Sequence, residues 1–286
     1  MKSIIVNNIS KSYKGKTALK NISFEVEKGE LFGVIGPDGA GKTTLFRILT
    51  TLILADSGDV KVEGYDVVED YKKIRNIVGY MPGRFSLYQD LTVRENIEFF
   101  ASVFNTTVEE NYHLVKDIYS HIEPFEKRKA GALSGGMKQK LALSCALIHK
   151  PDVLFLDEPT TGVDPISRKE LWNMLKDLQR KGITIIVSTP YMDEANLCDK
   201  IALINEGEFI DIDSPKTIVN KFPKKLYSVE GDNMPKLLKE LRENKNIETC
   251  FSFGDSCHIT LKNEEEENNY KEIKPSIEDY FMRLSK

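Results

Sequence analysis

One stretch of the sequence has the composition of a loop that holds phosphate groups. The residues GPDGAGKTT match the spacing G-x-x-x-x-G-K-[ST], and they lie between an apolar segment, 30–35, and a segment with helical apolar spacing, 43–54. Glycines in such a loop let backbone N–H groups point at phosphate oxygens, and the following helix start adds positive potential. Lys42 is placed to reach the β- and γ-phosphates, and the Thr43 hydroxyl to bind Mg²⁺. The predicted nucleotide-binding residues are Gly36, Gly39, Ala40, Gly41, Lys42, Thr43 and Thr44.

Two adjacent carboxylates follow a second apolar segment. The stretch VLFLDEPT is typical of a buried strand that ends at Asp157. Beside a phosphate loop, a carboxylate at this place binds the Mg²⁺ of a nucleotide, and the next residue, Glu158, is positioned to polarise an attacking water. Many strands end in acids, so the pattern is weak alone. Together with the phosphate loop it predicts ATP hydrolysis, with Glu158 and Lys42 as catalytic residues.

A third stretch, ALSGGMKQKLAL, carries a resemblance to a family. It places Ser134, Gly135 and Gly136 at a helix start, which is either a further phosphate-binding turn or an ordinary serine N-cap. Its position before the Val153 strand resembles the signature motif of ATP-binding cassette (ABC) ATPases, and the resemblance covers roughly residues 3–220. The resemblance implies that this turn acts in trans, so that two nucleotide-binding domains, in a homodimer or a heterodimer, enclose each ATP.

Two further residues match the same family. Tyr13, in ISKSYKGKTAL, matches the aromatic residue that stacks on adenine, and Asp164, in TGVD, matches the residue of the D-loop that contacts the partner domain. The segment DLTVREN, 90–96, resembles the part that meets the membrane permease, although Thr92 and Glu95 also form an ordinary capping box.

The end of the chain narrows the subfamily. PSIEDYF, 275–281, is similar to the tail of ATPases that serve ABC-2-type exporters, which include drug and antibiotic efflux systems. The resemblance therefore implies an ATP-driven export subunit that works in the cytoplasm, peripherally on the inner face of the cell membrane, beneath ABC-2-type permease subunits.

Two positions depart from the family pattern. Gly83 follows VGYMP where the family normally has a glutamine that contacts Mg²⁺ and the attacking water, and Pro190 stands where a histidine would grip the γ-phosphate. The four histidines lie elsewhere in the sequence, and Gln89 is a weak replacement candidate six residues beyond Gly83. Loss of one positioned polar group typically costs about 10²–10³ in rate. The sequence therefore predicts a slow ATPase.

Other functions stay open at this point. In one alternative, the chain's own site does not hydrolyse ATP, and its Ser134 turn completes the hydrolysing site of a partner chain. Retention of Glu158 argues against this alternative. A regulatory module that binds ATP without turnover is another. A third is a non-transport ABC protein, which usually carries two cassettes or a long coiled-coil insertion, and this sequence has neither.

Short strands and amphipathic helices are expected to position these residues. The segment 69–127 is charged and amphipathic and is predicted to be largely helical. Segment 224–261 predicts a strand, a helix at 234–243 and two further strands, and a last helix begins at 275–276. The acidic run 264–267 is predicted to be a solvated loop. The other predicted strands are 4–6, 22–26, 30–35, 153–156, 183–187, 201–204 and 208–211, and the other predicted helices are 43–54, 94–103, 109–121 and 165–181.

Length and composition agree with a globular protein of two parts. The 286 residues are 41% hydrophobic, and the net charge of −4 argues against nucleic acid as a partner. Four cysteines without CxxC spacing predict reduced, buried thiols. The expected fold is α/β: a P-loop NTPase core of the ABC type in 1–222, with a helical subdomain at about 85–150, and a small α+β accessory domain in 223–286.

Overall fold

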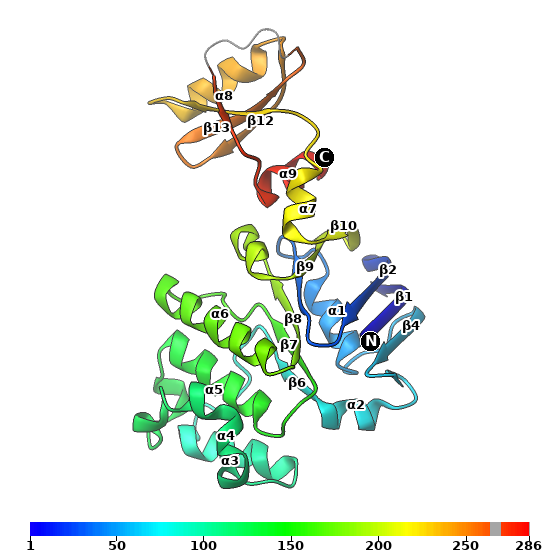
Figure 1. Cartoon of the computed structure of the whole chain (residues 1–286), viewed down its shortest axis with the longest axis vertical. Helices are drawn as coiled ribbons and strands as arrows, with labels where there is room; N and C mark the ends of the chain where they lie inside the picture. The colour runs from blue at the N-terminus through cyan, green and yellow to red at the C-terminus, as the bar shows by residue number, and fades with distance from the viewer. Residues whose placement is uncertain (264–269, 286) are drawn as a thin grey trace. The chain divides into compact units, whose positions relative to one another are not determined.

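The structure is a computed structural model that describes residues 1–263 and 270–285 (Figure 1). The predicted acidic loop at 264–267 lies outside the described residues. The chain forms two compact units, Met1–Ile212 and Asp213–Lys286. Among the helices of the described residues, none has both the length and the apolar character needed to cross a bilayer.

A six-stranded sheet forms the centre of the larger unit. Its strand order is β10-β9-β3-β8-β7-β6, and the pairs β3–β8, β3–β9, β7–β8 and β6–β7 are parallel. The central strands β3, β7 and β8 are buried along their whole length, as parallel strands covered on both faces are. The strands are β3 (Leu31–Ile35), β6 (Val78–Met81), β7 (Val153–Asp157), β8 (Thr184–Thr189), β9 (Lys200–Asn205) and β10 (Glu208–Asp213).

A second, antiparallel sheet encloses the core from the other side. It has the order β2-β1-β4-β5, with β1 (Lys2–Tyr13), β2 (Lys16–Glu27), β4 (Ser57–Val62) and β5 (Tyr65–Asp66). Helix α1 (Lys42–Leu49) lies between the two sheets (Figure 1). Its Phe46 meets Phe155 of β7 edge to face, with ring centroids 6.2 Å apart. The phosphate-loop helix is therefore anchored in the main core, as its apolar spacing predicts.

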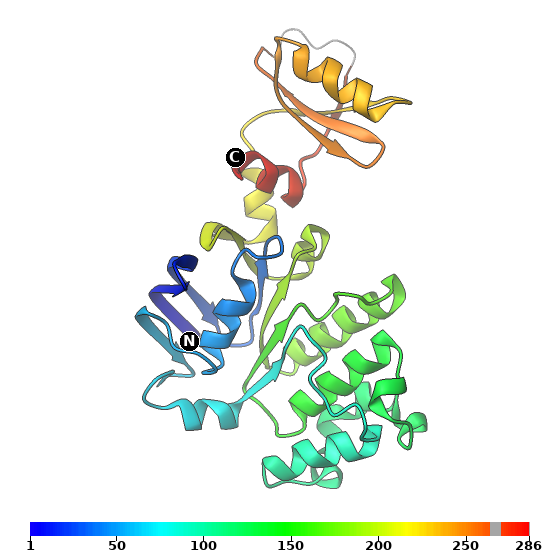
Figure 2. The same cartoon turned by 180° about the vertical axis from the view of Figure 1, so that it is seen from behind.

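Helices α3 (Val93–Val103), α4 (Val108–Tyr119) and α5 (Gly135–Leu147) pack against one another on one side of the larger unit (Figures 1 and 2). Capping boxes begin α3 at Thr92 and α4 at Thr107. Short 3-10 turns, η1 (Glu123–Phe125) and η2 (Ala130–Ala132), connect α4 to α5. Helix α6 (Pro165–Arg180) follows β7, and the 3-10 turn η3 (Met192–Leu197) follows β8.

Segment 69–127 is largely helical, as predicted, with α2 (Tyr71–Ile77), α3 and α4, but it also contains the strand β6, which pairs with β7 and was not expected. One prediction for this unit is wrong. Helix α1 ends at Leu49 and not at residue 54, since Thr51 has a φ of 62° and Leu52 is half-exposed. A left-handed residue stops a helix, whatever the apolar spacing beyond it.

The smaller unit is an antiparallel sheet with helices. Its strand order is β12-β13-β11-β14, and α8 packs on β12 and β13. The His258 Nδ1 atom lies 2.7 Å from the Asp279 Oδ1 atom, which joins β13 to the last helix. This arrangement agrees with the predicted α+β character. The elements are α7 (Pro215–Asn220), β11 (Leu226–Glu230), α8 (Met234–Glu243), β12 (Ile247–Phe253), β13 (Ser256–Leu261), β14 (Lys271–Ile273) and α9 (Ile277–Leu284).

Candidate nucleotide-binding site

The predicted phosphate loop connects β3 to α1, and two of its glycines lie against other backbone. A Cβ on Gly36 would lie 2.1 Å from the Ile204 carbonyl oxygen. Gly41 has a φ of 110°, and a Cβ there would lie 2.5 Å from the Ala18 carbonyl oxygen. Both positions therefore require glycine, and the loop is held closely against β9 and β2.

A cavity of about 690 Å³ opens over this loop. It brings together Tyr13 at the end of β1, the loop, and Glu158 after β7, which lie far apart in the sequence. The predicted residues Gly36 and Ala40 are buried in the loop beneath it. Its lining residues are Tyr13, Gly15, Lys16, Thr17, Ala18, Lys20, Gly39, Gly41, Lys42, Thr43, Thr44, Glu158, Glu206 and Gly207.

Lys42 is held at the floor of the cavity by the loop itself. Its Nζ atom donates to the carbonyl oxygens of Gly36, at 2.8 Å, and Pro37, at 2.9 Å, and lies 3.1 Å from Glu158 Oε1. The residue is 3% exposed. A buried ammonium needs such partners, because an unpaired charge in this setting is costly. The contacts fix the cation where a bound phosphate can replace Glu158.

Asp157 and Glu158 share one serine. Asp157 is 1% exposed, and its Oδ1 atom accepts a hydrogen bond from Ser188 Oγ at 2.6 Å. The same Oγ atom accepts from the Glu158 N–H at 2.9 Å. Glu158 has a φ of 52°, a left-handed conformation that is uncommon outside glycine. Ser188 on β8 thus sets the bend that turns Glu158 toward Lys42.

The two departing positions lie beside this machinery. A Cβ on Gly83 would lie 3.0 Å from the Asp157 carbonyl oxygen and 3.7 Å from Glu158 Cβ. Pro190 directly follows Thr189, whose carbonyl oxygen accepts from the Gly36 N–H at 3.2 Å. Gln89 is exposed, and its carbonyl oxygen accepts from the Gly131 N–H at 2.9 Å, so its backbone belongs to the η2 turn and not to the cavity.

Besides Gly36, Ala40 and the buried Asp157, four further predicted residues do not line this cavity. Ser134 is exposed, and its side chain accepts from the Met137 N–H at 3.4 Å as the N-cap of α5. Asp164 caps α6 by accepting from two backbone N–H groups, and the one from Ser167 contributes most to lowering the Asp164 pKa. A Cβ on Gly136 would collide with Ser167, so the first turns of α5 and α6 are packed together. The structure therefore separates Ser134, Gly135, Gly136 and Asp164 from the cavity of their own chain.

The sequence did not predict the roles of three further residues at or near the site. Lys16 and Lys20 on β2 line the cavity and add positive charge to it. Only their nearness to Tyr13 in the sequence could have suggested this. Glu194, in η3, is buried and joins the ends of β7 and β8 through Thr160 and Thr189. Thr189 and Glu194 both lie in the stretch IVSTPYMDEA, and Thr160 ends the stretch VLFLDEPT, but neither stretch indicates that these side chains meet.

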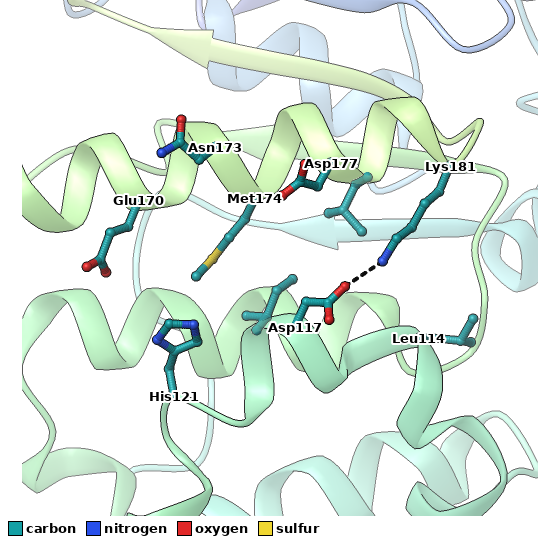
Figure 3. Close-up of a pocket in the computed structure, with 10 residues that line it drawn as sticks. Leu114, Asp117, His121, Glu170, Asn173, Met174, Asp177 and Lys181 are labelled. Atoms are coloured by element: carbon teal, nitrogen blue, oxygen red, sulfur yellow. Dashed lines mark hydrogen bonds and ion pairs between the residues drawn. The ribbon is translucent and has the colours of Figure 1, made fainter.

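A smaller cavity, of about 220 Å³, lies between α4 and α6 and shares no lining residue with the first (Figure 3). Its carboxylates already have cationic partners: Asp117 pairs with Lys181 at 2.7 Å, and Glu170 pairs with Lys140 at 2.7 Å. Asp177 pairs with Arg180 at 2.9 Å. Because these carboxylates are already paired and the remaining lining is partly apolar, a structural role is favoured over a binding one for this cavity.

Comparison with known proteins identifies the family. Residues 19–161 match the model of the family described as "ABC transporter". The chain is 38% identical to the probable multidrug ABC transporter ATP-binding protein YbhF of Escherichia coli, over 98% of this chain and 52% of the relative. The chain thus spans about half the length of that relative.

Another relative matches along most of both chains. The Nod factor export ATP-binding protein I of Burkholderia thailandensis is 35% identical over 97% of this chain and 95% of its own length. The linearmycin resistance ATP-binding protein LnrL of Bacillus subtilis is 39% identical over 72% of this chain and 67% of its own.

Solved structures agree with the fold. A dimeric post-hydrolysis state of the ATP-binding cassette MJ0796 bound to ADP and Pi has a TM-score of 0.67 and 26% identity, covering 74% of this chain and 98% of that one. The cbiO1 protein of Clostridium perfringens has a TM-score of 0.68 and 25% identity, covering 85% and 96%. With these likenesses and the cavity geometry, the chain belongs to the ABC transporter family, as one of its ATP-binding domains.

Proposed function

We propose that this chain is the ATP-hydrolysing subunit of an ABC-2-type export system and drives a separate membrane permease from the cytoplasmic side. The observation that carries the proposal is the cavity in which Lys42 and Glu158 meet at 3.1 Å above a closely held phosphate loop. Relatives named for multidrug and Nod factor export and for linearmycin resistance support export as the direction. The PSIEDYF ending supports the ABC-2 type.

ATP binding follows from the positions of the lining residues. The Tyr13 ring, at the end of β1, stacks on the adenine, and the phosphates bind at the loop and at Lys42. Mg²⁺ fits the oxygen donors that are present, because it is usually held by one or two carboxylates together with substrate phosphates. The Thr43 hydroxyl and the Asp157 carboxylate would hold it, and when bound it neutralises charge on the phosphates.

Hydrolysis uses the contact between Lys42 and Glu158. The γ-phosphate competes with the Glu158 carboxylate for the Lys42 ammonium, so that the carboxylate is released to accept a proton from the attacking water. Ser134 and Asp164 face outward and serve the site of a second nucleotide-binding domain. Because Gly83 and Pro190 offer no polar side chain to the water or the γ-phosphate, this site turns ATP over slowly.

The same two residues favour a second candidate. A chain without both polar groups would suit a heterodimer in which this site only binds ATP and its Ser134 turn completes the partner's site. The two candidates differ in one observable, which is turnover by this chain's own site.

Replacement of Lys42 by methionine tests the proposal. Lys42→Met keeps most of the side-chain volume but removes the cation, and charged hydrogen bonds contribute about 1.5–3 kcal/mol each. We expect ATP affinity to fall about 10–100-fold and turnover to disappear. Fluorescent-nucleotide titration and phosphate release by the purified chain measure the two effects.

The same variant controls for contaminating ATPases, because a contaminant would persist in both preparations. Wild-type turnover no higher than that of Lys42→Met would refute the hydrolysing function. If the wild type still bound ATP under those conditions, the degenerate heterodimer subunit would be supported instead.

Tyr13→Ala separates recognition of the base from the chemistry. Stacking of a base on an aromatic ring contributes about 1–3 kcal/mol, so we expect ATP affinity to fall by about tenfold with maximal turnover unchanged. A matched comparison with inorganic triphosphate, which has no base, should show no effect of the substitution. Equal weakening for both ligands would place Tyr13 outside the adenine site.

A further inference from the structure

A buried carboxylate connects the two loops on either side of Glu158. Glu194 is 2% exposed. Its Oε2 atom accepts hydrogen bonds from Thr160 Oγ1 at 3.0 Å and from Thr189 Oγ1 at 2.5 Å. Thr160 lies two residues beyond Glu158, and Thr189 is the last residue of β8, directly before Pro190. One oxygen atom therefore joins the segments that leave two neighbouring parallel strands.

An arginine from α6 balances the charge of this carboxylate. Arg168 Nε lies 3.6 Å from Glu194 Oε1, which is too far for a hydrogen bond, and both atoms are buried without a hydrogen-bond partner. The Arg168 guanidinium lies 4.1 Å above the ring of Tyr191. The Tyr191 N–H in turn donates to Thr189 Oγ1 at 3.1 Å. Arg168 thus compensates the charge of Glu194 without a hydrogen bond. Its stacking on Tyr191 also holds the segment after Pro190 in place.

The Glu194 contacts matter for Glu158 because positions 83 and 190 beside it have no polar side chain. Ser188 holds the Glu158 N–H, and Thr189 is the next residue on the same strand. Neither Gly83 nor Pro190 has a polar side chain that would hold the two segments in register. Hydrogen bonds to a charged acceptor are stronger than neutral ones, so the two threonine contacts connect these segments firmly.

We infer that Glu194 is a positioning residue: through Thr160 and Thr189 it keeps the loop that carries Glu158 in fixed register with the segment after β8. The inference extends the proposed function and rests on it for the effect on turnover. The coupling between the two loops does not depend on hydrolysis, and it can be measured without ATP.

Hydrogen exchange tests the coupling directly. Thr189→Val removes one hydroxyl at the end of β8, and the readout is taken on the other loop, where the Val163 N–H donates to the Thr160 carbonyl oxygen at 3.3 Å. We expect exchange at Val163 to become roughly tenfold faster, the factor that corresponds to one lost hydrogen bond. The matched control is Thr184→Val, which removes a buried hydroxyl at the other end of β8, where it accepts from the Gly29 N–H. Unchanged exchange at Val163 in Thr189→Val, or an equal rise in the control, would overturn the inference.

Turnover tests the effect on Glu158. We expect Glu194→Ala to lower the maximal rate of ATP turnover by about tenfold or more, because one positioned group contributes at least this much, with ATP affinity changed less than twofold. Glu194→Gln keeps an acceptor oxygen for both threonines and should recover part of the rate, which a general loss of stability would not explain. Parallel loss of affinity and rate, or no loss of rate in a folded variant, would contradict the positioning role. A wild-type chain without turnover would refute the proposed function, and the exchange experiment would then decide the coupling alone.

Discussion

Replacement of Glu158 by glutamine is expected to lower ATP turnover by about 10²–10⁴-fold while ATP binding is retained. Glutamine preserves the shape of the side chain but cannot accept the proton of the attacking water. In this structure the Glu158 carboxylate also neutralises Lys42 at 3.1 Å, so the variant frees the ammonium for phosphate. ATP affinity should therefore stay the same or rise, and phosphate release under saturating ATP, beside a binding titration, measures both.

The matched control is Glu170→Gln, the same substitution at the cavity between α4 and α6 (Figure 3). Glu170 is paired with Lys140 at the surface, and surface ion pairs of this kind contribute about 0–1 kcal/mol, so turnover should not change. A Glu158→Gln variant that hydrolyses ATP at the wild-type rate would remove Glu158 from its catalytic role. The contact between Glu158 and Lys42 would then have no part in hydrolysis.

The parts of the fold that were predicted are those in which a local pattern matches what the tertiary structure requires. The segment before the phosphate loop is apolar throughout, and β3 is buried throughout. Helix α8 has the predicted bounds, 234–243, because its capping asparagine and its apolar stripe are both local signals. The four cysteines are buried and free, as their scattered spacing predicts.

Strand β6 and the end of α1 were not predicted correctly, because they depend on contacts distant in the sequence. β6 has only four residues, VGYM, and it is a strand because Val78 to Met81 pair with β7, across a stretch of about seventy residues that contains the helical subdomain. Nothing within the segment 69–127 indicates that partner. Likewise the apolar spacing of 43–54 continues past Leu49, but Leu52 and Leu54 are 53% and 60% exposed. Local periodicity does not reveal where the surface of the core lies.

The candidate site divides in the same way. The phosphate loop and the Asp157–Glu158 pair carry their chemistry in contiguous residues, and the family resemblance supplied Tyr13. The Glu194 contacts were not predicted, because Thr160 follows β7 and Arg168 lies on α6, and both meet Glu194 only in the folded chain. Buried polar networks of this kind depend on tertiary geometry, and single threonines or glutamates carry no signal of it.

Restoring the two missing side chains is expected to raise turnover. The double variant Gly83→Gln, Pro190→His should hydrolyse ATP about 10²-fold faster than the wild type, or more, since each positioned polar group is worth about 10²–10³ in rate. Histidine at position 190 follows Thr189 directly, next to the strand end whose carbonyl oxygen holds the Gly36 N–H. It should therefore contribute the larger share.

Glutamine at position 83 should contribute less than its full effect, and the reason is steric. A Cβ there would lie 3.0 Å from the Asp157 carbonyl oxygen, which is closer than ordinary contacts, so the loop must move by a few tenths of an ångström. The control is the double variant Gly83→Ala, Pro190→Ala, which imposes the same crowding at position 83 and removes the same proline without adding polar groups. Single-turnover rates of the two double variants under saturating ATP then isolate the polar contribution. If the glutamine–histidine variant is no faster than the alanine control, the two missing side chains do not limit turnover at this site, and the roles assigned to Gly83 and Pro190 are wrong.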